Sequence, residues 1–533
     1  MLGGMQDWPL RIMRILDHAE REHGSRELVS LWADRSVTRT SWAGIARDSR
    51  RLANALERLG IRPKDRVATL GMNHARHVVA WYGTIGMGGI VHTVNPRLFE
   101  EQLVYILNHA EDRVLFYDAA FAPLVEKLKP QLTTVEHYVC FDPPAGQEGF
   151  DSLIAGESDS FAWVEGDERE PVMLCYTSGT TGNPKGVLYE HRSTALHALA
   201  QLAPDVFDLA GAAVVLPVVP MFHAAAWGLI FSTPMAGGKM VFSADYTPSV
   251  MCDLIRDEGV THTAGVPTVW LALMNYAENA GRDLAKLSTV HIGGSAAPRA
   301  MIRYFTERGI RVGHAWGMTE MSPLGTCGAP TADWGKLSDE ERLDVLAKQG
   351  RVPFGVELRT VDDEGHLLPR DGRTSGRLQA RGPWVIFQYY QDSSGPAIDP
   401  EGWFDTGDVA ILHPSGVLQI TDRSKDVIKS GGEWISSIDL ENAAVGCPGV
   451  AEAAAVGVRH PKWDERPLLL VVRKDGAEVT AEAILRHLSG CVAKWWLPDE
   501  ILFVEALPHT ATGKLLKTKL REQYRDYQLS SAA

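Results

Sequence analysis

The chain has 533 residues, which at about 150 residues per domain is enough for roughly three or four folding units. Hydrophobic residues make up 45% of the chain and charged residues 23%, a globular composition that excludes disordered and fibrous classes. The formal net charge of -14 argues against a broad surface for nucleic acid or anionic lipid. We therefore expect no nucleic-acid partner, and any phosphate ligand must be held by a local site.

The first residues and the longest uncharged stretch are the places where a signal peptide and a transmembrane segment would lie. The chain reaches Asp7 before any long apolar run, which argues against a signal peptide. The uncharged stretch 209–238 contains Pro217, Pro220 and Pro234, which a lipid-exposed helix tolerates poorly. We expect this stretch to form buried core or a pocket wall, with no transmembrane segment. The 6 cysteines include no C-x-x-C pair, so we expect reduced thiols and a cytoplasmic protein.

Short apolar runs alternate with helical patterns over most of the chain. Strands are expected to begin at Val67, Ile90, Val114 and His137, with helices over 75–87 and 100–108. Further strands are expected at 172–176, 214–216, 240–242, 260–264, 289–292 and 311–314. This βα alternation predicts an α/β fold with two sheet lobes flanked by helices.

The pattern of predicted elements changes near Arg351. Short strands are now separated by turn signals such as 363–365, which predicts an antiparallel β subdomain. Just before it, Ser338 and Glu341 form a capping box that opens a polar surface helix.

A compact α+β pattern follows the charged segment 421–432. Strands are expected near Val450 and Leu468, a helix from Ala481 and a strand at Ile501. We therefore predict a large N-terminal domain, 1–424, and a small mobile C-terminal domain, 425–533.

The segment "YTSGTTGNPKG", 176–186, is the clearest candidate for ligand binding. It is not a Walker loop, because Pro184 precedes Lys185 and Gly186 follows it, and the dinucleotide pattern G-x-G-x-x-G is also missing. Backbone N–H groups and side-chain hydroxyls in such a turn can wrap a polyphosphate, and Lys185 adds a point charge. The hydroxyls belong to Thr177, Ser178, Thr180 and Thr181, around Gly179. An ordinary Gly/Ser/Thr turn is the alternative.

The whole string resembles the phosphate-binding loop of the adenylate-forming superfamily, which includes acyl-CoA synthetases, luciferases and the adenylation domains of peptide synthetases. Further matches follow in the superfamily's order: "GGSAAP" (293–298), "WGMTE" (316–320), "WFDTGD" (403–408), "DRSKDVIKSGGEWIS" (422–436) and "PHTATGKLLK" (508–517). Taken singly, the polar residues of these motifs are more often turn residues or solvated surface charges. The ordered set, which spans Tyr176 to Lys517, supports the resemblance.

The resemblance implies a site for ATP and Mg²⁺. Catalytic roles fall to Lys514, Glu320, Thr177 and His223, with Glu320 holding the metal through water. The nucleotide set is Thr177, Ser178, Gly179, Thr180, Thr181, Lys185, Gly294, Ser295, Trp316, Gly317, Thr319, Asp408, Arg423 and Lys514. Within this set, Asp408 and Arg423 bind the ribose. Trp316 replaces the Tyr that is common in the family, which keeps adenine stacking but loses a phenol hydrogen bond.

The resemblance also implies sites for an acid and for coenzyme A. The acyl pocket comprises His223, Trp227, Gly293, Gly294 and Pro298. The CoA set comprises Lys429, Gly431, Gly432, Glu433 and Trp434, with Lys425 as the hinge of a rotating C-terminal domain. His223 stands where amino-acid-activating relatives usually have Asp, which disfavours an amino substrate. If Trp227 points into the acyl tunnel it favours a short or medium acid; simple core packing is the alternative.

The implied activity is that of an acid–CoA ligase, which forms acyl-AMP and pyrophosphate from ATP and then acyl-CoA and AMP. "GGEWISS" (431–437) and "KWWLPD" (494–499) are similar to bacterial medium-chain fatty-acid and 3-methylmercaptopropionate CoA ligases. A carrier-loading adenylation enzyme is disfavoured by His223 and by the chain's end soon after Lys514, and a noncatalytic nucleotide sensor by Lys514. A luciferase-like oxygenase shares the first half-reaction and stays open. Homodimers are frequent among such enzymes, and the sequence does not specify the acid.

Overall fold

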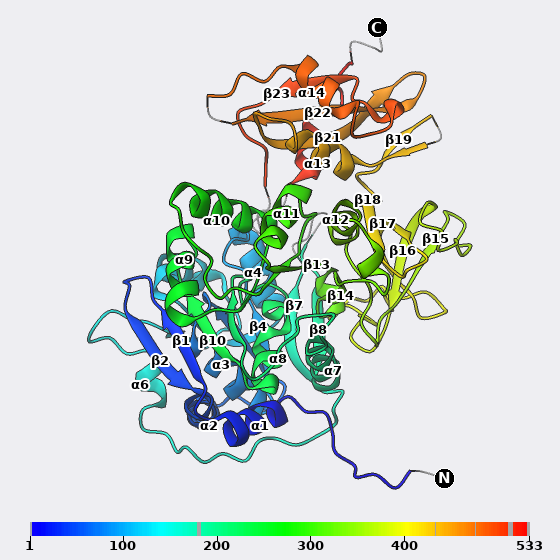
Figure 1. Ribbon diagram of the computed structural model, residues 1–533. Coiled ribbons are helices and arrows are strands. Elements are labelled where there is room, and N and C mark those ends of the chain that lie inside the picture. Colours follow the sequence, from blue (N-terminus) through cyan, green and yellow to red (C-terminus); the bar gives the residue numbers. More distant parts are fainter. Residues whose placement is uncertain (1–2, 178–182, 432, 475, 510–514, 530–533) are drawn as a thin grey trace.

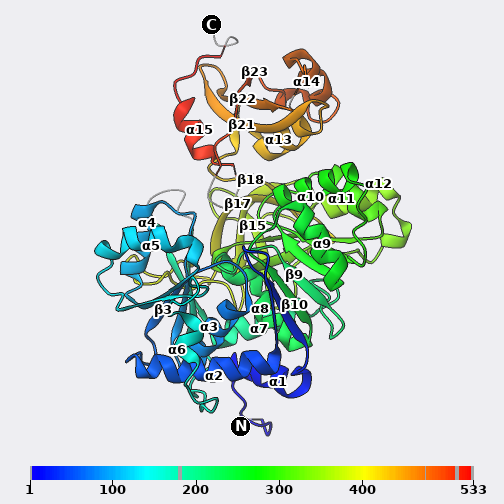
Figure 2. The same ribbon diagram turned by 90° about the vertical axis from the view of Figure 1, so that its left-hand side faces the viewer.

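The computed structural model describes residues 3–177, 183–431, 433–474, 476–509 and 515–529. Two sheet lobes stand side by side, and a smaller C-terminal unit, residues 425–529, lies above them (Figures 1 and 2). This is the predicted α/β architecture. None of the helices in these ranges has both the length and the apolar character needed to cross a bilayer.

The first lobe is built on a mostly parallel sheet that runs β6-β5-β3-β4-β7-β8 over the described residues. Its strands are β3 (Arg66–Leu70), β4 (Ile90–Thr93), β5 (Asp112–Tyr117), β6 (His137–Cys140), β7 (Pro171–Tyr176) and β8 (Gly186–Glu190). All of β4 is buried, as expected for a parallel strand covered by helices on both faces. The strands expected from Val67, Ile90, Val114 and His137 are thus confirmed. Only β8, which pairs antiparallel with β7, was not anticipated.

The second lobe has a sheet in the order β14-β13-β12-β11-β9-β10-β1-β2 within the described ranges. Its strands are β1 (Glu27–Leu31), β2 (Val37–Ser41), β9 (Val214–Pro217), β10 (Lys239–Ser243), β11 (His262–Gly265), β12 (Thr289–Ile292), β13 (Arg311–Gly317) and β14 (Leu324–Cys327). The first strand of the chain therefore belongs to the second lobe, because β1 pairs in parallel with β10. This ties the N-terminus to a strand about 200 residues away in the sequence.

Helices cover both sheets. They are α1 (Met13–His23), α2 (Trp42–Arg58), α3 (Ala75–Gly86), α4 (Glu100–His109), α5 (Ala122–Leu128), α6 (Phe150–Ile154), α7 (His191–Gln201), α8 (Leu229–Ala236), α9 (Pro248–Glu258), α10 (Pro267–Asn279), α11 (Arg299–Glu307) and α12 (Asp339–Ala347). Helices α3 and α8 meet between the lobes, where the Tyr82 hydroxyl donates to the Ile230 carbonyl at 2.9 Å and Trp81 stacks on Phe231. The predicted capping box is present, with Ser338 as the N-cap of α12.

A four-stranded antiparallel sheet follows the second lobe, as predicted, in the order β15-β16-β17-β18. Its strands are β15 (Glu357–Val361), β16 (Ser375–Arg381), β17 (Phe404–Leu412) and β18 (Leu418–Arg423). The next sheet begins at Ile428 and belongs to the C-terminal unit. The predicted hinge residue, Lys425, lies in the short segment between the two sheets.

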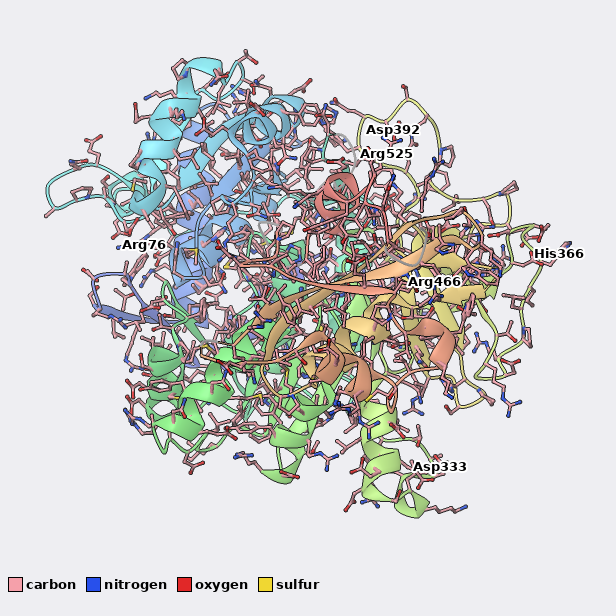
Figure 3. The ribbon with its side chains drawn as sticks, turned by 90° about the horizontal axis from the view of Figure 1, so that it is seen from above. Arg76, Asp333, His366, Asp392, Arg466 and Arg525 are labelled. Carbon is pink, nitrogen blue, oxygen red and sulfur yellow. The ribbon has the colours of Figure 1, made fainter. Side chains whose placement is uncertain are left out.

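The C-terminal unit has its own sheet and its own core. The elements are β19 (Ile428–Ser430), β20 (Glu433–Ile435), α13 (Ser437–Val445), β21 (Val450–His460), β22 (Asp464–Arg473), α14 (Ala481–Leu488), β23 (Glu500–Phe503) and α15 (Lys517–Gln523). Apolar side chains from β21, β22, α13 and α14 pack together, apart from the cores of the lobes. Seen from above, this unit, with Arg466 and Arg525 labelled, covers the place where the lobes and the four-stranded sheet meet (Figure 3).

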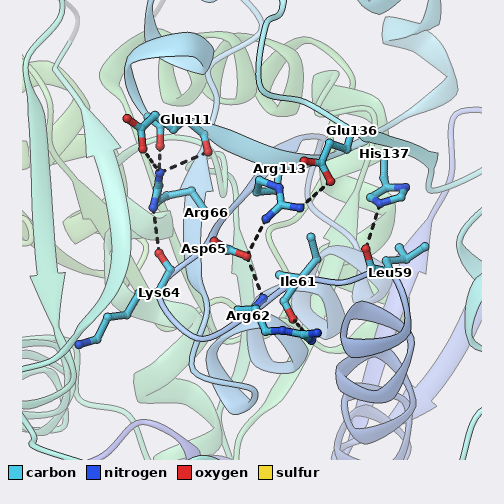
Figure 4. Close-up of polar contacts among 11 residues, drawn as sticks. Leu59, Ile61, Arg62, Lys64, Asp65, Arg66, Glu111, Arg113, Glu136 and His137 are labelled. Carbon is cyan, nitrogen blue, oxygen red and sulfur yellow. Dashed lines mark hydrogen bonds and ion pairs between the residues drawn. The ribbon is translucent and has the colours of Figure 1, made fainter.

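Charged side chains form a network at the amino-terminal edge of the first lobe's sheet (Figure 4). Arg113 in β5 pairs with Asp65 at 3.2 Å and with Glu136 at 2.5 Å, on the segments that lead into β3 and β6. Arg66 at the start of β3 pairs with Glu111, just before β5, at 2.5 Å. Ligands of open α/β sheets bind at the opposite edge, outside the carboxyl ends of the strands. We therefore regard this network as a structural feature.

Candidate functional site

A cavity of about 640 Å³ lies between the carboxyl ends of the strands and the C-terminal unit. Among the residues that line it are Thr177, Lys185, His223, Trp227, Gly293, Gly294, Trp316, Gly317, Thr319, Glu320, Arg423 and Lys425, all named from the sequence. The C-terminal unit contributes Leu515, Leu516, Lys517, Thr518 and Arg521. Lys514 lies outside the described residues, but its neighbour Leu515 is at the cavity wall. Segments far apart in the sequence therefore meet at one place.

The phosphate-loop candidate connects β7 to β8, and its two ends are held together. The backbone N–H of Thr177 donates to the Lys185 carbonyl at 2.9 Å, and the Lys185 N–H donates to the Thr177 hydroxyl at 3.2 Å. Ser178, Gly179, Thr180 and Thr181 lie outside the described residues. The Lys185 ammonium is 3.6 Å from the Asp392 carboxylate and 4.7 Å from the centre of the Tyr389 ring. The Lys185 ammonium thus lies beside the two ends of the loop.

Glu320 is a buried carboxylate in the turn that follows β13. Its side chain is 8% exposed, and the Tyr389 hydroxyl donates to Oε1 at 2.9 Å. Burial raises the pKa of Glu320, because the ionised form loses its hydration. A divalent cation in the cavity would favour the ionised form, so this residue fits the metal role implied by the resemblance. Tyr389 was missed from the sequence, since a lone tyrosine in a turn-rich segment follows no pattern.

Trp316, Asp408 and Arg423 come from three strands and meet beside the cavity. The Trp316 indole N–H donates to Asp408 Oδ2 at 2.8 Å, and Arg423 Nε lies 2.8 Å from Oδ1. Asp408 is 2% exposed, whereas Trp316 and Arg423 line the cavity. From the sequence, Trp316 is expected to keep adenine stacking and to lose a phenol hydrogen bond. The structure instead shows an indole hydrogen bond to the carboxylate.

An unusual turn contributes Ala224 and Trp227 to the cavity wall. Ala224, Ala225, Ala226 and Trp227 have φ of 42°, 56°, 50° and 53°, and Gly228 has φ of 82°. A left-handed run of non-glycine residues costs roughly 1–2 kcal/mol per residue, so packing must hold it. Helix α7 supplies part of this support, because the Gln201 amide donates to the Trp227 carbonyl at 2.5 Å.

Trp227 lines the cavity and also packs in the core. A Cβ on Gly293 would lie 3.0 Å from its Cη2 atom, so the ring fits against a bare backbone. Gln201 and Phe207, which were not predicted, also line the cavity. Ser295 and Asp408, expected in the nucleotide set, and Pro298, expected in the acyl set, are not among the cavity-lining residues. Gly294 has φ of 86°, and the chain turns there.

The residues expected to bind coenzyme A lie on the β19–β20 hairpin, and those described are not part of the cavity wall. The Lys429 ammonium lies 5.5 Å from the centre of the Trp434 ring. The Gly431 N–H donates to the Trp463 carbonyl at 2.8 Å, and a Cβ at Gly431 would lie 3.1 Å from the Trp463 ring. Gly432 and the side chain of Glu433 lie outside the described part of the chain.

Polar contacts join the C-terminal unit to the strand just before the hinge. The backbone N–H and hydroxyl of Ser437 both donate to Asp422 Oδ2 at 2.6 Å. Lys517 in α15 donates to the Ser437 hydroxyl at 2.5 Å and pairs with Glu441 at 2.7 Å. Arg521 pairs with Asp426. These contacts hold the segment after Lys514 over the cavity.

Family models and relatives agree on the kind of protein. The model described as AMP-binding enzyme matches residues 16–390, and the AMP-binding enzyme C-terminal domain matches residues 439–514. The chain is 50% identical to 3-methylmercaptopropionyl-CoA ligase of Ruegeria lacuscaerulensis, with 99% of each chain covered. It is 44% identical to the medium-chain-fatty-acid–CoA ligase of Ectopseudomonas oleovorans, with 100% of this chain and 99% of the relative covered. A crystal structure of an anthranilate CoA ligase in complex with anthranoyl-AMP superposes with a TM-score of 0.86 at 25% identity, covering 97% of this chain and 99% of that one.

Proposed function

The chain belongs to the AMP-binding enzyme family and is an ATP-dependent acid–CoA ligase, and we propose that it activates a short- or medium-chain acid such as 3-methylmercaptopropionate. The observation that carries the choice of acid is the bulky Trp227 side chain in the cavity wall, against Gly293. Two of the relatives are named for acids of this size class.

In the first half-reaction, a carboxylate oxygen attacks the α-phosphorus of ATP, and the bond to pyrophosphate breaks. Residues 177–185 and Lys185 hold the phosphates, and Asp408 and Arg423 hold the ribose. Lys514, beside the cavity-lining Leu515, neutralises charge that gathers on the phosphate oxygens. The closed ends of the loop and the contacts of α15 support this assignment, because both bring donors to the same cavity.

Glu320 holds Mg²⁺ through water in this proposal. When bound, the ion neutralises phosphate charge and orients the oxygens for in-line displacement. The residue's own task is to supply a negative charge at the buried end of the Thr319–Met321 turn, and Tyr389 holds one of its oxygens in place. The raised pKa of Glu320 supports the role, since a buried carboxylate gains stability from a cation.

The acid lies between His223 and Trp227, with its carboxylate toward the phosphates. Gly293 and Gly294 leave room for its chain, and Phe207 contributes an apolar side to the cavity. The apolar side chains of Trp227 and Phe207 favour an uncharged acyl chain, since an ammonium group beside them would be desolvated.

In the second half-reaction, the CoA thiolate attacks the acyl carbonyl, and AMP leaves. The β19–β20 hairpin with Lys429, Gly431 and Trp434 is outside the cavity wall, so it must approach for this step. We propose that the C-terminal unit turns about Lys425, which lies between β18 and β19. The small Gly431 and Gly432 then let the backbone lie against the pantetheine arm.

A panel of acids tests the proposal. Acids from C2 to C12 and 3-methylmercaptopropionate are supplied with ATP and Mg²⁺, and pyrophosphate, AMP and thioester are measured with and without CoA. We expect short or medium acids to give CoA-dependent AMP and thioester. A best substrate of C12 would contradict the assigned acid class, and acyl-AMP that never passes to CoA would contradict the second step. A homodimer and a cytoplasmic location remain predictions.

A further inference from the structure

The contact between Trp316 and Asp408 crosses from one sheet to another. Trp316 belongs to β13 of the eight-stranded sheet, whereas Asp408 and Arg423 face each other as a residue pair in β17 and β18. Both oxygens of the carboxylate have a protein donor, the indole N–H on Oδ2 and the guanidinium on Oδ1, each at 2.8 Å. Two donors from different directions fix the plane of the carboxylate.

The backbone beneath the indole is shaped to accept it. Gly325 lies in β14, which pairs with β13. A Cβ at Gly325 would lie 2.4 Å from Cε3 and 2.5 Å from Cζ3 of Trp316. Real Cβ contacts are not this short, so the ring requires glycine at residue 325. The position of the N–H is therefore set by packing as well as by the hydrogen bond.

We propose that Trp316 is a positioning residue for ribose recognition, whose indole N–H holds the Asp408 carboxylate ready to accept the ribose hydroxyls. The inference rests on the proposed function of Asp408 as the ribose ligand. A carboxylate oxygen can accept more than one hydrogen bond, so the O2′–H and O3′–H groups can donate to the same carboxylate that Trp316 and Arg423 hold. A fixed carboxylate also avoids the entropy of ordering it at each binding event.

A purely stacking role for Trp316 predicts something different. Stacking acts on adenine and does not distinguish ribose from 2′-deoxyribose, so losing it weakens both nucleotides equally. Positioning acts through the hydroxyls, because a 2′-deoxy nucleotide has no O2′–H to donate to the Asp408 carboxylate. The ratio of the two affinities therefore separates the roles.

The test measures binding of AMP and 2′-deoxyAMP to the full chain by calorimetry, for wild type and Trp316→Phe. Phenylalanine keeps an aromatic face but has no N–H. We expect wild type to prefer AMP, and Trp316→Phe to lower that preference about tenfold, which corresponds to about 1.4 kcal/mol. Trp163→Phe is the matched control, because its indole also donates to a carboxylate, Asp17, at 2.8 Å, but away from the cavity.

Equal weakening of AMP and 2′-deoxyAMP in Trp316→Phe would overturn the proposal, as would a wild type without preference. If thermal melting shows that Trp316→Phe is not folded, Trp316→Leu is used, and we expect the same fall in the ratio of AMP affinity to 2′-deoxyAMP affinity. An unchanged ratio in Trp316→Leu would equally overturn it. The binding measurement contains no carboxylic acid. If binding follows the expected pattern but none of the acids in the panel releases pyrophosphate, the proposed function is contradicted and the ribose role of Trp316 stands.

Discussion

Replacing Trp227 with alanine should lengthen the acids that the enzyme accepts. The indole lies at the cavity wall against Gly293, and its truncation opens apolar space in the pocket proposed for the acyl chain. The left-handed backbone at residue 227, with φ of 53°, is equally costly for tryptophan and alanine, so the substitution acts mainly through the side chain.

The size of the shift follows from apolar burial. Each methylene that enters the opened space contributes about 0.8 kcal/mol, which is roughly fourfold in kcat/KM. Three additional methylenes should therefore raise kcat/KM by roughly 50-fold relative to the short acid. The optimum of the wild-type profile moves to a longer chain, and the short acid loses contacts. Removing a buried tryptophan also costs about 3–5 kcal/mol of stability.

The assay is kcat/KM for straight-chain acids from C2 to C12, from CoA-dependent AMP formation. Trp32→Ala is the matched control, because Trp32 and Trp227 are both 8% exposed but Trp32 is not part of the cavity wall. Trp32→Ala should lower the unfolding temperature without moving the optimum. A Trp227→Ala profile that parallels wild type at every chain length would refute the role of the indole in selectivity.

Other predictions concern catalysis, the hinge and the C-terminal unit. Lys514→Ala should slow adenylation by roughly 100- to 1000-fold yet largely keep thioester formation from supplied acyl-AMP, and equal losses would contradict the assignment. Lys425→Pro should impair the thioester step more than adenylation; comparable half-reaction rates would reject the hinge. Lys517→Met should lower stability by about 3–5 kcal/mol in denaturant unfolding, because Glu441 is left buried without its cation, and an unchanged midpoint would rule this out. Burial raises the pKa of Asp439 from 3.8 to about 6, so the folded state binds its proton more tightly and the ionised carboxylate costs stability as pH rises through this window. Asp439→Asn should therefore stabilise the protein by up to about 3 kcal/mol at pH 7.5 and little at pH 4, and an equal gain at both pH values would count against this reasoning.

The fold was largely predictable where a pattern is local. Strands with continuous apolar runs, such as β4 and β12, and the helix capped by Ser338 lie where the sequence places them. The pairing of Leu28 with Met240 was not predictable, because no local signal shows which strand a distant segment joins. The short strand β8 was also not predicted, because it follows directly after a turn.

The same distinction applies to the site. A motif identifies a segment, so Thr177, Glu320 and Arg423 could be named, and the structure brings them to one cavity. It does not say which way each side chain faces: Ser295 and Asp408 were named in the same way, and neither is part of the cavity wall. Tyr389 acts through its contact with Glu320, which only the three-dimensional arrangement reveals.

The reversed winding of residues 224–227 limits how this enzyme can be redesigned. Branched side chains at Cβ are nearly incompatible with such a backbone, which explains three consecutive alanines before the indole. A mutant library that varies these alanines would return mostly misfolded chains. To accept new acids, substitutions are better placed at Phe207, which lines the same cavity and has no left-handed backbone, or at Trp227 itself.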